Sequence, residues 1–87
     1  MKVQLLVSES CVPCEEAEKI WRRVADESAF DFSVVNLTDA EGQKFADQLE
    51  LTTIPAVIID GVLMAIGVQS LEEARALISR SPAGNQS

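Results

Sequence analysis

Two kinds of apolar pattern alternate along this chain, and their order restricts the fold more than any other feature. Short apolar runs, expected to be strands, occupy Val3–Val7, Phe30–Leu37, Pro55–Ile59 and Val62–Ile66. Stretches with helical spacing of apolar residues begin at Cys11, after Thr38 and after Ser70, which gives the order βαβαββα. Strands joined through a helix are normally parallel and connected by right-handed crossovers. We therefore predict an α/β fold with a four-stranded mixed sheet and helices on both faces.

The chain is too short for two cores, so its 87 residues predict a single domain. We place that domain at residues 1–80. The last residues, 81–87, have no apolar pattern and are expected to form a flexible tail.

Local signals support the individual elements. Thr38-Asp39-Ala40-Glu41 and Ser70-Leu71-Glu72-Glu73 both have the spacing of a capping box, so each predicts a helix start. Asp60-Gly61 predicts a tight hairpin, because a type I′ turn needs positive φ at both central residues. Gly42 is expected to weaken its helix by up to about 1 kcal/mol relative to alanine.

The charge balance excludes several classes of partner. Fourteen acidic against seven basic residues give a formal charge of -7. This argues against nucleic acid and against anionic membrane surfaces, which both attract basic proteins. No apolar stretch approaches the roughly 20 residues of a membrane span. The apolar N-terminal run is short and interrupted by Gln4, unlike a signal peptide, so we expect a cytoplasmic protein.

The pair Cys11 and Cys14 carries the chemistry that we expect. Two cysteines so close in sequence close only a very small ring, which is a poor structural staple. In a reducing compartment such a pair is catalytic or binds a metal. Here it lies where a strand gives way to a helix, the position of a redox dithiol. No glycine-rich dinucleotide turn is present, so no cofactor is expected.

The helix start predicts different roles for the two thiols. Cys11, exposed at the helix N-terminus, would have its pKa lowered by free amides and would act as the nucleophile. Cys14, one turn further, would be more buried and would resolve the mixed disulfide. Val12 completes the turn with Pro13, which the first helical turn tolerates.

Acidic neighbours oppose a thiolate at this turn. They are Glu9, Glu15, Glu16 and Glu18, and no basic residue is close in sequence. We therefore expect a modestly lowered pKa for Cys11 and a reducing couple.

Two other functions fit the same cysteines. The first is a metal-binding or metal-delivery module, since small copper chaperones also place CxxC after a strand. Two thiolates leave zinc short of its usual four ligands, however, and the chain has no histidine. We therefore expect no metal site. The second alternative is a redox-inert binding module.

Two motifs together resemble the thioredoxin superfamily: Cys11-Val12-Pro13-Cys14 and Thr52-Thr53-Ile54-Pro55. The resemblance covers roughly residues 2–80 and is greatest to small members of glutaredoxin size or like archaeal thioredoxins. It implies a thioredoxin-like fold and a thiol-disulfide oxidoreductase that reduces protein disulfides through a mixed disulfide. It also implies a cis Pro55 facing the cysteines and excluding metal, with Thr53 and Ile54 beside it contacting an extended substrate. The reductase or thiol donor that would restore the dithiol is not identified by the sequence.

The chain departs from thioredoxins proper in three ways. Ser10 stands where they have tryptophan, and Val12 replaces their glycine. Leu5 stands at the position where thioredoxins have a buried carboxylate, which assists proton transfer at the resolving cysteine. That assistance is therefore expected to be absent unless Glu15 or Glu18 supplies it.

The chain also departs from glutaredoxins. They carry a basic residue shortly before the motif, where this chain has Glu9, and a Gly-Gly pair near the last helix, where only Gly67 is present. These differences argue against glutathione binding by the family's usual route. We take a protein disulfide as the preferred partner.

Overall fold

The computed structural model describes residues 1–9, 11–28, 30–50 and 53–80. Within these residues the elements are β1 (Lys2–Val7), α1 (Val12–Ser28), β2 (Asp31–Asn36), α2 (Ala40–Leu49), β3 (Ala56–Ile59), β4 (Val62–Ile66) and α3 (Leu71–Arg80). The predicted order βαβαββα is confirmed, and each strand end matches the prediction or differs from it by one residue. The predicted tail, residues 81–87, lies outside the described residues.

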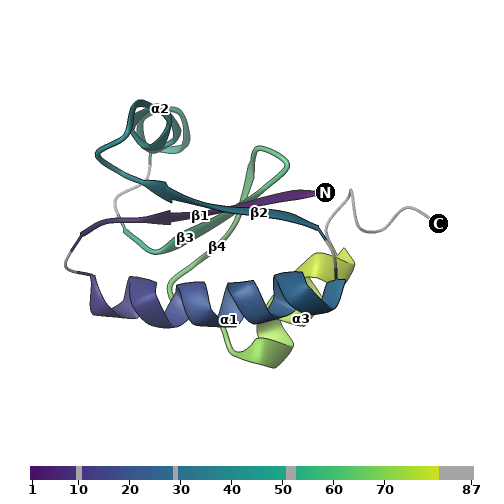
Figure 1. Cartoon of the computed structure of the whole chain (residues 1–87). Helices are drawn as coiled ribbons and strands as arrows, with labels where there is room; N and C mark the ends of the chain where they lie inside the picture. The colour runs from purple at the N-terminus through teal and green to yellow at the C-terminus, as the bar shows by residue number, and fades with distance from the viewer. Residues whose placement is uncertain (10, 29, 51–52, 81–87) are drawn as a thin grey trace.

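The four strands form one mixed sheet in the order β2-β1-β3-β4. β1 runs parallel to β2 and antiparallel to β3, and β4 is antiparallel to β3. Helix α2 covers one face of the sheet, while α1 and α3 cover the other (Figure 1). This is the predicted α/β arrangement with helices on both faces.

Alternation along β1 explains the two layers of the core, because successive side chains of a strand point to opposite faces. Val3 and Leu5 pack with the buried face of α1, whereas Leu6 packs on the side of α2. Trp21 is fully buried in the first of these clusters.

Two of the three local signals are confirmed. Asp60 and Gly61 have φ of 50° and 83°, as the hairpin requires. At the start of α3 the Ser70 amide donates to Glu73 Oε1 at 2.8 Å, and the Glu73 amide donates to Ser70 Oγ at 3.1 Å. These reciprocal bonds are the predicted capping box.

The predicted capping box at Thr38 is wrong. The residue that caps α2 is Asp39, without a side-chain capping bond. Thr38 turns instead to Asn36, whose Oδ1 accepts from both its amide at 2.9 Å and its hydroxyl at 2.8 Å. Glu41 accepts a hydrogen bond from Gln4 Nε2 at 3.2 Å. The Asn36 side chain thus competes successfully for Thr38, as asparagine does in tight turns.

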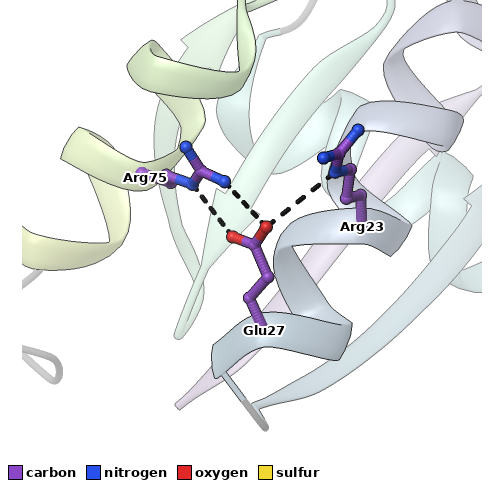
Figure 2. A network of polar contacts seen from close by, with 3 residues as sticks. All are labelled: Arg23, Glu27 and Arg75. Carbon is purple, nitrogen blue, oxygen red and sulfur yellow. Dashed lines mark hydrogen bonds and ion pairs between the residues drawn. The ribbon is translucent and has the colours of Figure 1, made fainter.

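An exposed ion pair joins α1 to α3 near the C-terminal end of α1 (Figure 2). Arg75 donates from Nε and Nη2 to the two oxygens of Glu27 at 2.9 and 2.7 Å, and Arg23 Nε lies 3.9 Å from Glu27 Oε2. The hydrogen bonds from Arg75 lower the pKa of Glu27 below its ordinary value. This ion pair links the two helices that share one face of the sheet.

None of the helices in the described ranges has the length and apolar character to cross a membrane.

Candidate redox site

The sheet register brings three connecting segments to one end of the molecule. Leu6 of β1 pairs with Ala56 of β3, and Ala56 pairs with Ile66 of β4. β1 and β4 both end near this row and β3 begins there. The turn into α1, residues 53–55 and the segment after β4 therefore leave the sheet together.

Cys11 and Cys14 form a disulfide across the first turn of α1, with their Cα atoms 5.2 Å apart. Cys11 directly precedes the helix and takes the N-cap position, because its carbonyl accepts from the Glu15 amide at 3.3 Å. The Cys14 amide donates to Cys11 Sγ at 3.2 Å. The sulfur thus takes the place that a serine or aspartate oxygen usually has at a helix start. A thiolate on Cys11 would receive the same hydrogen bond.

The two cysteines differ in exposure. Cys14 is 3% exposed and belongs to the core cluster under α1, whereas Cys11 is partly exposed. Val12 and Pro13 between them are exposed, Val12 to 73%. Cys11 is therefore the more accessible of the two cysteines to a substrate.

A pocket of about 480 Å³ opens beside Cys11. Its lining consists of Val7, Ser8, Glu9, Cys11, Val12, Cys14, Glu15 and Glu18. The carboxylate of Glu18 also pairs with Arg22 at 2.8 Å, outside this lining. The residues around the pocket therefore place negative charge near the exposed sulfur, in line with the acidic surroundings seen in the sequence.

The Ile54–Pro55 peptide bond is cis, as the family resemblance implied. Pro55 is fully buried, and Ile54 is partly buried against the cluster that contains Cys14. Cys11 packs against that same cluster. Thr53 is exposed. Together with the strand register, these contacts place Cys11, Cys14 and the Ile54–Pro55 bond at the same end of the core.

Exposed apolar residues border this end of the sheet. Besides Val12 they are Ile66 at 49% and Val68 at 39%, on either side of Gly67. The Gly67 amide donates to the Pro55 carbonyl at 2.7 Å, so this segment lies directly against the cis proline. Sequence patterns do not indicate that Ile66 and Val68 are exposed, since nothing local distinguishes an exposed isoleucine or valine from a core one.

Leu5 is fully buried in the cluster that contains Cys14. Among the described residues the buried polar side chains are Gln4 and Gln69, and Glu15 lies exposed on the first turn. A buried carboxylate next to Cys14 is thus not found in the described part of the chain. Nor do these residues contain a group of three or more His, Cys, Asp or Glu side chains able to hold a metal ion.

A dithiol at the first strand-to-helix turn, on a sheet of this order, is the arrangement of thioredoxin-fold redox proteins. The chain belongs to the thioredoxin family, since the family profile described as a thioredoxin domain matches residues 1–79. It is 29% identical over 84 residues to a probable thioredoxin of Archaeoglobus fulgidus, covering 97% of this chain and 92% of that protein. The family and the disulfide pair support a thiol oxidoreductase in general.

Solved structures show the same fold. Thioredoxin 1 of Thermosipho africanus superimposes with a TM-score of 0.73 at 21% identity, covering 99% of this chain and all of the other. NrdH-redoxin of Escherichia coli, a glutaredoxin-like protein with a thioredoxin-like activity profile, gives 0.61 at 18% identity. That match covers 88% of this chain and 95% of NrdH-redoxin.

Proposed function

We propose that this chain reduces disulfide bonds in other proteins, with Cys11 as the attacking thiol and Cys14 as the resolving thiol. The observation that carries this proposal is the hydrogen bond from the Cys14 amide to Cys11 Sγ, on the more exposed of the two cysteines. A helix N-terminus that donates to a sulfur favours its anionic form, which is the nucleophile in thiol-disulfide exchange.

The reaction takes place in two exchanges. The Cys11 thiolate attacks one sulfur of the substrate disulfide, which forms a Cys11–substrate disulfide and releases the other substrate sulfur as a thiolate that takes up a proton. Cys14, having lost its proton to solvent, then attacks Cys11 Sγ. The Cys11–Cys14 disulfide forms and the second substrate thiol leaves. Two electrons pass to the substrate, and a thiol donor or reductase must return them.

A protein substrate suits the surroundings of the site. The apolar residues Val12, Ile66 and Val68 offer exposed surface that an extended segment would cover. Ile54 precedes the cis proline, where the family resemblance places backbone contacts to the substrate, with Thr53 beside it. Glutathione is less suitable because it carries net negative charge and the pocket is lined by glutamates. A reducing, cytoplasmic setting remains part of this proposal.

Insulin reduction coupled to dithiothreitol oxidation tests the proposal. We expect turnover by the natural sequence, none by Cys11→Ser, and a trapped mixed disulfide through Cys11 in Cys14→Ser. Equal activity of all three proteins would contradict the assigned roles. Tight, stoichiometric metal binding by the reduced protein, without insulin reduction, would favour the metal-binding alternative.

The acidic pocket can be tested separately through the thiolate absorbance of Cys11. Glu9 lines the pocket, so Glu9→Gln should lower the pKa of the Cys11 thiol by removing a nearby negative charge. Asp47→Asn removes one exposed carboxylate from α2, on the other face of the sheet, and is the matched control. Equal titration curves for both variants and the natural sequence would show that the pocket does not influence the thiol.

A further inference from the structure

The segment between β4 and α3 is fixed at two points on either side of Val68. On one side, Gly67 has a positive φ of 90° and donates its amide to the Pro55 carbonyl at 2.7 Å. On the other side, Gln69 turns inward and is 8% exposed. Val68 between them keeps 39% of its surface exposed. The direction of Val68 therefore depends on both attachments.

The side-chain amide of Gln69 joins two elements that are distant in sequence. Its Oε1 accepts from the indole Nε1 of Trp21 at 3.2 Å, and its Nε2 donates to the Ile66 carbonyl at 3.4 Å. Trp21 is fully buried on the same face of α1 as Cys14. One glutamine thus links the helix that carries the resolving cysteine to the end of β4 beside the cis proline.

We propose that Gln69 is a positioning residue for substrate binding. It holds Gly67 and Val68 against Pro55, and so keeps the apolar surface beside the dithiol in a binding-ready shape. It does not contact the sulfurs, so it sets affinity for a protein substrate and leaves the exchange chemistry unchanged. This inference rests on the proposed function, because it concerns the substrate surface of the same site.

The chain contains a matched control for this role. Gln4 is a second buried glutamine, 4% exposed, whose Nε2 donates to Glu41 on α2. It lies in the middle of β1, opposite Ser33 and Ile58, and away from the row that ends at Ile66. Gln4→Met and Gln69→Met remove the same amide from the interior with nearly the same volume. Both should lower stability, but only one touches the segment beside Pro55.

The test compares KM and kcat for insulin with the rate for bis(2-hydroxyethyl) disulfide, which is too small to cover the apolar surface. For Gln69→Met we expect KM for insulin to rise about five-fold, the effect of one ordinary hydrogen bond. We expect kcat and the small-disulfide rate to stay within about two-fold of the values for the natural sequence, a change smaller than the loss of one hydrogen bond would cause. Exchange of the Gly67 amide, followed by NMR, should become faster in this variant. Gln4→Met should change none of these readouts.

Trp21→Phe provides a second variant, because it removes the indole donor and leaves Gln69 in place. It should raise KM for insulin in the same direction. Added to Gln69→Met it should cause little further rise, since both changes break one connected set of contacts.

Several results would overturn the inference. An unchanged KM for Gln69→Met would do so, as would an equal rise in KM for Gln4→Met, which would indicate a general loss of stability. A parallel fall in the small-disulfide rate would show that Gln69 acts on the sulfur chemistry. If the natural sequence reduces neither substrate, the proposed function fails, and the positioning role fails with it.

Discussion

Replacing Gly42 by alanine should destabilise the protein, although alanine is the better helix former. A Cβ at this position of α2 would meet the Asn36 carbonyl oxygen, and would lie 2.8 Å from the Asn36 carbonyl carbon and 2.9 Å from Leu37 Cα. All three are backbone atoms, so no side chain can rotate away. The same Asn36 oxygen accepts from the Asp39 amide at 2.9 Å, which fixes the turn into the helix.

The size of the effect follows from two opposing terms. Overpacking a well-packed site costs about 1–3 kcal/mol, and backbone contacts place this site at the upper end, near about 3 kcal/mol. Helix propensity returns about 1 kcal/mol in favour of alanine. We therefore expect Gly42→Ala to lower the free energy of unfolding by about 2 kcal/mol, as the difference of these terms.

Urea unfolding followed by the fluorescence of the buried Trp21 measures this change. The neighbouring Gln43 is exposed on the same helix, so Gln43→Ala and Gln43→Gly give the propensity difference without the clash. Alanine should be the more stable of that pair by about 1 kcal/mol. If Gly42→Ala instead raises the free energy of unfolding, a Cβ at position 42 does not clash with the backbone at the end of β2, and the reasoning is refuted.

Two further predictions concern helix ends and acid stability. Ser70→Ala should cost about 1 kcal/mol in urea unfolding because it removes the observed capping bond, whereas Thr38→Ala should cost less than about 0.5 kcal/mol. Equal losses would contradict this difference. The lowered pKa of Glu27 means that its pair with Arg75 contributes stability above the ordinary glutamate value of 4.5 and loses it as pH falls through the lowered value. The stability difference between the natural sequence and Glu27→Gln should therefore shrink over that acid range, and a difference independent of pH would contradict the role of the ion pair.

Much of the fold follows from short-range patterns. The spacing of apolar residues predicts each strand and helix, and the order of these elements leaves only a few possible topologies. Asp60-Gly61 and the box from Ser70 to Glu73 were predicted because their partners are at most three residues apart. The predicted capping box at Thr38 was wrong because of another local contact: Asn36, two residues away, accepts the hydrogen bonds of Thr38.

The site shows the same division. The unequal exposure of Cys11 and Cys14, and the amide that donates to the first sulfur, follow from their places before and within one helical turn. The approach of Ile54–Pro55 to the same end of the core required the family resemblance, because no local pattern indicates which segments meet.

The sequence by itself determined the order of elements and the redox-active turn, because these depend on residues within one helical turn or one strand of each other. Only the tertiary structure decided the roles of Gly42 and Gln69. In the sequence Gly42 is a weak helix residue, and in the fold it is the position where α2 meets the backbone after β2. Gln69 resembles any loop glutamine until packing brings it to Trp21, 48 residues away. Such roles arise from contacts between separate elements, and those contacts exist only once the chain is folded.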